Sequence, residues 1–88
     1  MEKSITTAHI SFSLVQFIKN EIVAESLEID ENTVLAEIGI DSFSLIEIVL
    51  FIERTYGVVL SDDSLNPENL KNIQSIAACT MEQLKMNA

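Results

Sequence analysis

The chain has 88 residues, of which 48% are hydrophobic, so it can form one small domain with a single modest core. Fourteen Asp and Glu residues against five Lys and Arg residues give a formal net charge of −9. A surface of this charge repels phosphate backbones and anionic lipids, which argues against nucleic acid and membrane partners. It favours partner proteins that present a basic face.

The chain shows no sign of export or membrane insertion. Its single cysteine, Cys79, cannot form an internal disulfide, and no long apolar run follows Met1. We therefore expect a cytoplasmic, monomeric protein without a signal peptide.

Turn-forming residues are scarce, with two glycines, Gly39 and Gly57, and one proline, Pro67. An all-β fold needs turn signals more often, whereas these three separate stretches with helical periodicity. We predict an all-α fold, a small four-helix bundle with a long loop between helices one and two and a short third helix. The bundle is a single domain over residues 1–88, and residues 1–8 are predicted to form a poorly ordered N-terminal extension.

The first helix is predicted over about residues 9–27, because Leu14, Ile18 and Ile22 recur every four residues. Residues 27–40 are predicted to be a connection that contains a polar stretch and scattered apolar side chains. A free loop of this length is unusual in a compact domain, so we expect the apolar side chains to anchor it. These anchors are Ile29, Val34, Leu35, Ile38 and Ile40.

The second helix is predicted over about Ser42–Tyr56, and Gly57 suits the position that follows a helix C-terminus. Its N-terminal cap has two possible registers. Asp41 suits a cap directly before the predicted start of the helix, and Ser42 suits a cap at that start. Ser44 and Glu47 also fit a capping box, which would begin the helix two residues later.

Pro67 suits the first turn of a helix, so a short third helix is predicted at about residues 67–71. Asn72 is predicted to cap a last helix from Ile73 to about Lys85. The buried face of this last helix follows the spacing i, i+3, i+4, i+7 and i+11. It consists of Ile73, Ile76, Ala77, Thr80 and Leu84.

On a helical wheel at about 100° per residue, the second helix carries two apolar stripes rather than one. The core stripe consists of Leu45, Ile48, Val49, Ile52 and Tyr56. The opposite side should face water, yet it holds apolar residues beside charged ones: Phe43, Ile46 and Leu50 beside Glu47, Glu53 and Arg54. Either other parts of the chain cover this second stripe, or it is a docking surface for a partner.

Ser42 lies where the second stripe meets the N-terminus of this helix. A serine in this place can simply cap the helix. The place also suits a serine that carries a phosphate group, because free backbone N–H groups and the helix dipole stabilise negative charge there. Both interpretations stay open on the residues alone.

The segment from Leu35 to Ile48, LAEIGIDSFSLIEI, resembles the attachment segment of acyl carrier proteins. That family is summarised by (L/I)-G-x-D-S-L followed by an apolar-Glu-apolar step. The positions that fit its spacing are Gly39, Asp41, Ser42 and Glu47. The similarity runs from about residue 23 to the C-terminus and leaves out residues 1–10.

The resemblance implies a bundle of acyl-carrier type with 4′-phosphopantetheine bound covalently to Ser42. A phosphopantetheinyl transferase would move this group from coenzyme A to the serine, and its thiol would carry acyl groups as thioesters in fatty-acid or polyketide-type biosynthesis. Asp41 matches the aspartate that helps engage the transferase and its metal ion. The resemblance also implies docking of acyl-processing enzymes with basic faces. The docking positions are Phe43, Ile46, Glu47, Leu50 and Glu53.

The chain departs from the family pattern at a few positions. Phe43 replaces the usual leucine, and Ser44 and Arg54 stand where many fatty-acid carriers are acidic. The Gly-Ile-Asp-Ser run is similar to polyketide-type carriers, whereas peptidyl carriers more often have Gly-Gly-x-Ser. The alternatives are an aminoacyl carrier, of peptidyl or D-alanyl type, and an unmodified helical adaptor that binds a protein.

Carriers of this family can fold an attached acyl chain back into the bundle. The expected lining here is Leu45, Val49, Leu65 and Leu70, with Ile73 behind them.

The remaining chemically active residues indicate no enzyme and no metal site. Cys79 is predicted to be a small apolar residue of the last helix, and His9 an exposed residue without a second ligand nearby. Asp62 and Asp63 lack the glycine and the alternating ligands of a calcium loop. Ser42 is not in a Gly-x-Ser-x-Gly turn, so we predict no catalytic residue.

Overall fold

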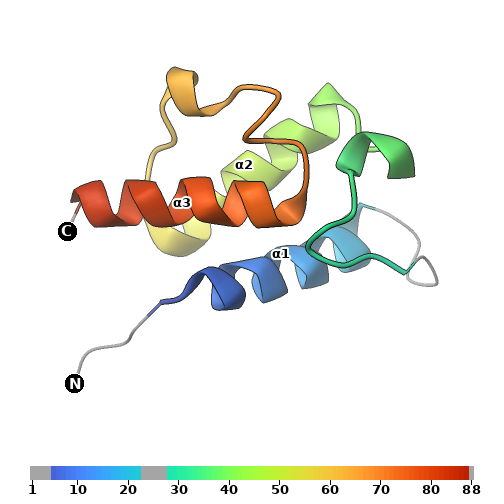
Figure 1. Ribbon diagram of the computed structural model, residues 1–88, viewed down its shortest axis with the longest axis horizontal. Helices are drawn as coiled ribbons and strands as arrows, with labels where there is room; N and C mark the ends of the chain where they lie inside the picture. Colours follow the sequence, from blue (N-terminus) through green and yellow to red (C-terminus); the bar gives the residue numbers. More distant parts are fainter. Residues whose placement is uncertain (1–4, 23–27, 88) are drawn as a thin grey trace.

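The fold is known from a computed structural model that describes residues 5–22 and 28–87. Its main elements are three α-helices (Figure 1): α1 (Thr7–Glu21), α2 (Ser42–Tyr56) and α3 (Ile73–Asn87). Two short 3₁₀ helices lie in the connections: η1 (Leu35–Ile38) and η2 (Asp62–Ser64). Within the described ranges, β pairing is limited to an isolated bridge between Val34 and Asn72. The predicted all-helical class is therefore confirmed.

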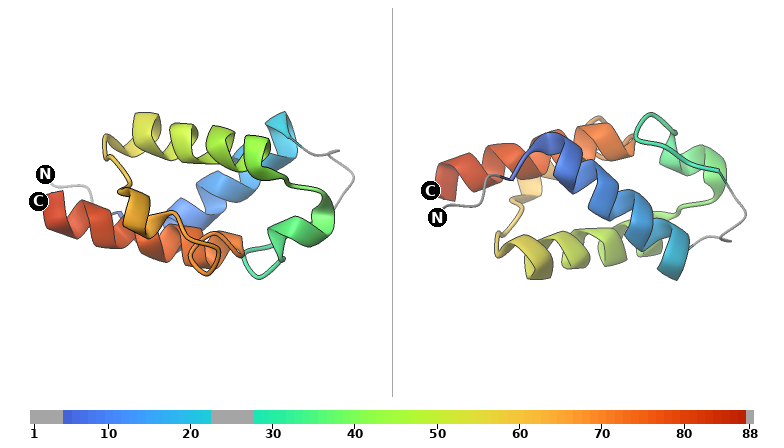
Figure 2. Two further views of the ribbon diagram at one scale, coloured as in Figure 1. Left: turned by 90° about the horizontal axis from the view of Figure 1, so that it is seen from above. Right: turned by 90° about the horizontal axis from the view of Figure 1, so that it is seen from below.

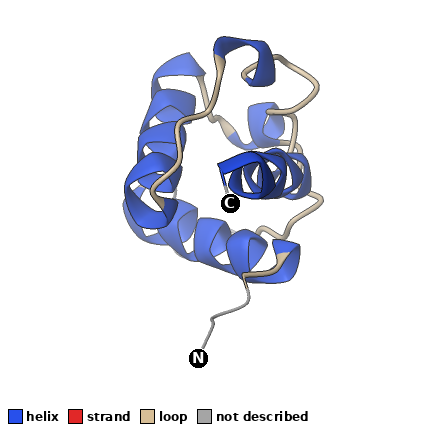
Figure 3. Cartoon of the chain, turned by 90° about the vertical axis from the view of Figure 1, so that its left-hand side faces the viewer, coloured by secondary structure: helices blue, strands red, loops and turns tan. Residues whose placement is uncertain are grey.

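The three helices surround a common centre (Figure 3). Helices α2 and α3 run in roughly the same direction, while α1 runs the opposite way and crosses them diagonally (Figure 2). Helix α1 contacts α3 more extensively than it contacts α2. Side chains from all three helices and from the connections fill the centre: Ile10, Leu14, Ile18, Leu35, Ile40, Ile48, Ile52, Val58, Leu60, Ile73, Ile76 and Ala77.

Local signals at both ends decide where α2 begins and ends. The Asp41 carboxylate accepts a hydrogen bond from the backbone N–H of Ser44 at 2.9 Å, so Asp41 is the N-cap and the later register is wrong. At the other end Gly57 has a φ of 68°, a left-handed conformation that glycine adopts without strain. The predicted bounds of α2 are confirmed.

The connection before α2 is tied to the beginning of α3. The backbone N–H of Leu35 donates to the Lys71 carbonyl at 3.0 Å, and that of Gln74 donates to the Glu31 carbonyl at 2.9 Å. Leu35 and Ile40 are buried in the core. Because these contacts hold both ends of residues 31–40, they also fix the place at which α2 starts.

The first helix differs from its predicted bounds. It begins at Thr7, because the Thr6 hydroxyl accepts the backbone N–H of His9 at 3.1 Å and caps it there. Thr7 and Ala8, assigned from the sequence to a poorly ordered extension, are therefore helical. Helix α1 ends at Glu21 with Ile22 as its C-cap, and the other residues of its predicted length, 23–27, lie outside the described residues, as do residues 1–4.

The predicted short third helix at residues 67–71 is a hydrogen-bonded turn in the structure, and η2 precedes it. The side chain of Asn66 accepts the backbone N–H of Asn69 at 2.8 Å, and the Asn69 side chain donates to the Ser64 carbonyl at 2.8 Å. These bonds offer the backbone an alternative to helix continuation. Asn72 then caps α3 as predicted, by accepting the backbone N–H of Ser75 at 2.8 Å.

The orientation of α2 predicts different costs for two isoleucines only two residues apart. Ile48 is fully buried whereas Ile46 is 56% exposed. Ile48→Ala should lower the free energy of unfolding by about 2–5 kcal/mol, because it leaves a cavity in the core. Ile46→Ala should change it by less than about 1 kcal/mol. Urea denaturation followed by circular dichroism measures both values, and equal losses would contradict this orientation of α2.

Candidate functional site

Ser42 is the first residue of α2, and its side chain is exposed. The residue before it, Asp41, is extended and forms the cap, so the serine hydroxyl is not needed as a cap. The hydrogen bond from the backbone N–H of Ser44 holds the pKa of the Asp41 carboxyl below its ordinary value of 3.8. A charged carboxylate and a free hydroxyl therefore stand side by side at the positive end of the α2 dipole.

The second apolar stripe of α2 is open to solvent. Phe43 is 70% exposed, Ile46 56% and Leu50 43%, so neither a loop nor another helix covers them in the described structure. Glu47 is also exposed and lies on the same side of the helix. We call Phe43, Ile46 and Leu50 the exposed ridge of α2. A contiguous apolar surface of this kind on a small acidic domain usually marks an interaction site.

A hollow of about 340 Å³, here called the Ser42 hollow, opens on one side of the exposed ridge. Ser42 is its single polar lining residue, and the others are Leu45, Ile46, Val49, Leu50, Leu65 and Leu70. The four residues predicted from the sequence to line an acyl cavity are all among them. Ile73, expected behind them, is fully buried. The structure therefore places the serine hydroxyl at the edge of an apolar recess.

A second hollow continues from the first on the side of the connection before α2. Its volume is about 380 Å³, and it shares Leu45, Leu65 and Leu70 with the Ser42 hollow. The two spaces therefore adjoin each other at these three side chains. Lys71 is the one positively charged residue in the lining of the second hollow.

Glu53 has a different setting from the other predicted docking residues. Its carboxylate accepts the backbone N–H of Leu60 at 3.1 Å, and the side chain is half-buried. This bond ties the end of α2 to the connection that follows it, a role that the sequence does not indicate. Leu60 lies seven residues further on, beyond the turn at Gly57, and no short-range pattern links the two.

The other residues singled out from the sequence stay apart from this site. His9 is exposed, and its ring lies edge-on to Tyr56, with ring centroids 6.3 Å apart. Cys79 is half-buried, with Sγ 3.9 Å from the Ser64 carbonyl oxygen. No group of three or more metal-ligating side chains comes together in the described ranges. None of the helices in those ranges has the length and apolar character needed to cross a bilayer.

Comparison with known proteins identifies the family. The family model of the phosphopantetheine attachment site matches residues 11–80, which include the whole of α2 and the connections on both sides of it. A search of curated proteins finds no significant match. Because the match covers most of the chain, the protein belongs to the phosphopantetheine-binding carrier proteins of the acyl carrier family. Members of this family bear 4′-phosphopantetheine as a covalent prosthetic group, work with transferases and acyl-processing enzymes, and are generally not catalysts themselves.

The residues around Ser42 fit such a group. The hydroxyl is exposed for a transferase, and the helix N-terminus favours the negative charge of a phosphodiester. The neighbouring hollow offers an apolar surface within reach of the same residue.

The lowered pKa of Asp41 predicts a pH-dependent contribution to stability. A carboxyl whose pKa is lower in the folded chain stabilises the fold above its unfolded pKa, and this contribution is lost as the pH falls through the folded pKa. Between about pH 6 and about pH 2.5 the wild type should therefore lose more stability than Asp41→Asn, which keeps an uncharged cap.

Asp63→Asn provides the control, because Asp63 is exposed and the substitution removes the same charge. Urea denaturation at a series of pH values measures the difference. Asp63→Asn should show the pH dependence of stability of the wild type. If Asp41→Asn shows the same pH dependence, the charged cap does not stabilise α2.

Proposed function

We propose that the chain is an acyl carrier protein that bears 4′-phosphopantetheine on Ser42 and carries acyl intermediates in fatty-acid or polyketide-type biosynthesis. The observation that carries this proposal is the position of Ser42, exposed at the first residue of α2 and at the mouth of an apolar hollow. The arm supplies a terminal thiol that holds an acyl group as a thioester. The chain supplies the attachment point, the apolar hollow and the docking surface.

The attachment itself is a group transfer that a separate transferase catalyses. The Ser42 oxygen forms a bond to the phosphorus of the phosphopantetheinyl group, and the pyrophosphate bond of coenzyme A breaks. Adenosine 3′,5′-bisphosphate leaves, and the hydroxyl proton is released. The Asp41 carboxyl is ionised at neutral pH, and its lowered pKa keeps it ionised at more acidic pH as well, so it can bind a metal ion or a basic side chain of the transferase.

The lining of the Ser42 hollow favours an acyl group over an aminoacyl group. Apart from the serine, each lining side chain is apolar. Burying a methylene group there stabilises the complex by about 0.8 kcal/mol at most. An aminoacyl group carries an ammonium ion, which loses hydration in the hollow without gaining a partner. An aminoacyl carrier would therefore leave this hollow unused.

The exposed ridge of α2 is the proposed docking surface for the transferase and the acyl-processing enzymes. Its three apolar side chains lie beside the exposed Glu47. The net charge of −9 speeds encounters with basic partners, and the apolar contacts then hold the complex. Glu53 contributes to this field through its charge, while its carboxylate stays bound to Leu60.

An unmodified adaptor would use the same ridge but would need no modification of Ser42. The first test is therefore incubation of the protein with coenzyme A, magnesium and a broad-specificity transferase. The wild type should gain the mass of one phosphopantetheinyl group, and Ser42→Ala should gain none. Mass spectrometry of the intact chain measures this directly.

Ser44→Ala is the matched control, because it removes a hydroxyl two residues away and keeps the backbone N–H that Asp41 binds. It should be modified as the wild type is. A wild type that stays unmodified with several such transferases would overturn the carrier proposal.

The apolar hollow predicts that a long acyl chain stabilises the fold. The form that bears an octanoyl thioester should melt at a higher temperature than the form with the free thiol, because part of the chain leaves water. An acetyl thioester, which has the same linkage without the chain, should melt as the free thiol does. Differential scanning calorimetry compares the three forms. Equal melting temperatures would mean that the chain stays in solvent, as expected for an aminoacyl carrier.

A further inference from the structure

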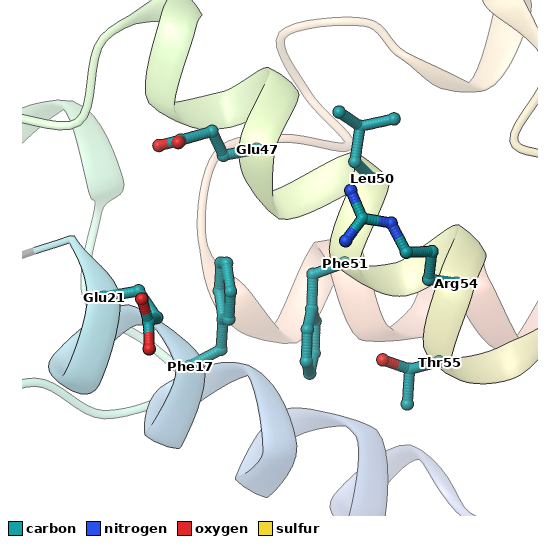
Figure 4. A pocket seen from close by; sticks show the side chains of 7 residues that line it. All are labelled: Phe17, Glu21, Glu47, Leu50, Phe51, Arg54 and Thr55. Atoms are coloured by element: carbon teal, nitrogen blue, oxygen red, sulfur yellow. The ribbon is translucent and has the colours of Figure 1, made fainter.

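A third hollow borders the exposed ridge of α2 on the side away from the Ser42 hollow. It lies between α1 and α2 and has a volume of about 400 Å³ (Figure 4). Helix α1 contributes Phe17 and Glu21, which are four residues apart and so share a face. Helix α2 contributes a face that includes Glu47, Leu50, Phe51 and Arg54. We call this space the α1–α2 hollow.

The two phenylalanines form the middle of the hollow. Their ring centroids are 4.3 Å apart and their planes differ by 19°, so the rings are stacked face to face. Both side chains are half-buried. In Figure 4 the pair is seen edge-on, so the outer face of Phe17 is turned toward one end of the hollow and that of Phe51 toward the other.

Charged side chains divide the hollow into two ends. Glu21 and Glu47 lie on the Phe17 side of the ring pair, whereas Arg54 lies on the Phe51 side (Figure 4). The two carboxylates come from different helices and are both exposed. One end of the hollow therefore combines two carboxylates with an aromatic face. A guanidinium group matches this combination, because it pairs with carboxylates and stacks on aromatic rings.

We propose that the α1–α2 hollow receives an arginine side chain of a partner enzyme, with its guanidinium between Glu21 and Glu47 and against the face of Phe17. The proposal rests on the proposed carrier function and extends the docking surface from α2 to α1. Leu50 connects the two surfaces, since it belongs to the exposed ridge and also lines the hollow.

Arg54 determines at which end of the hollow the partner arginine binds. Its positive charge at the far end repels a cation placed there, so the partner arginine has one favourable position rather than two. Arg54 is therefore compatible with docking of basic partners on α2. It lies at one end of the hollow and leaves the end with the carboxylates free for the partner arginine.

The test uses the whole chain and a small probe, acetyl-arginine amide, followed by NMR of labelled protein. The probe should shift the ring signals of Phe17 and the carboxylate signals of Glu21 and Glu47 in a saturable way. Acetyl-citrulline amide has the same shape without the charge, and acetyl-lysine amide has the charge without the planar group. Both control probes should bind more weakly than the arginine probe, because the proposed contact needs the positive charge and the planar group together.

Substitutions in the hollow sharpen the test. Glu21→Gln and Glu47→Gln should each weaken probe binding by about two- to fivefold, as expected for an exposed ion pair. Arg54→Gln should strengthen it by a factor of similar size. Glu82→Gln is the matched control, because Glu82 is exposed on α3 and the substitution changes the net charge equally. It should leave probe binding unchanged.

Three results would overturn the inference: no saturable shift at Phe17, equal binding of the citrulline or lysine probe, or equal effects of Glu21→Gln and Glu82→Gln. Modification of Ser42 by the transferase is measured on the same samples. If Ser42 is modified and the arginine probe does not bind, the inference fails alone and the carrier function stands. If Ser42 is not modified, the carrier function fails, and with it the assignment of this hollow to a partner enzyme.

Discussion

The complete burial of Ile48 and Ile52 fixes the rotation of α2 about its own axis. With these two side chains in the core, the opposite half of the helix points away from the core, and no other described part of the chain covers it. In this chain it holds Phe43, Ile46 and Leu50, so the packing that stabilises the domain also creates the exposed ridge. The two flanks of the same helix then line two hollows of different chemistry, one apolar and one charged.

The residue at which α2 starts is also fixed by specific contacts. Asp41 caps the helix, and the connection before it is bound by backbone hydrogen bonds to the beginning of α3. Ser42 is thereby the junction of three features: a helix N-terminus that favours negative charge, an apolar hollow and the exposed ridge. A phosphopantetheinyl arm attached there would have its phosphate at the helix terminus and the apolar hollow beside its point of attachment. This arrangement accounts for how one small domain could both protect an acyl chain and present it.

Much of this arrangement could be predicted from the sequence, because it depends on short-range signals. The wheel of α2, the cap residues and the glycine after the helix are all readable within a few positions, and the apolar wall formed by Leu45 and Val49 follows from the same wheel. Contacts between distant residues were not predictable. The bond from Leu60 to Glu53 changes the setting of a residue that looks like a surface charge. The stacking of Phe17 on Phe51 depends on the crossing of α1 over α2, which no periodicity specifies. The turn in place of a third helix reflects side-chain bonds of Asn66 and Asn69 that compete with helix formation.

We infer that an arm on Ser42 would place its acyl chain in the Ser42 hollow and leave the ridge and the α1–α2 hollow free for partners. Nuclear Overhauser effects from a ¹³C-labelled octanoyl chain, attached through the arm to the wild-type protein, test this most directly. We expect contacts from the chain to the methyl groups of Leu45, Val49, Leu65 and Leu70, and none to the rings of Phe17 and Phe51. Contacts to the phenylalanine rings instead, or no contact with the protein at all, would contradict it.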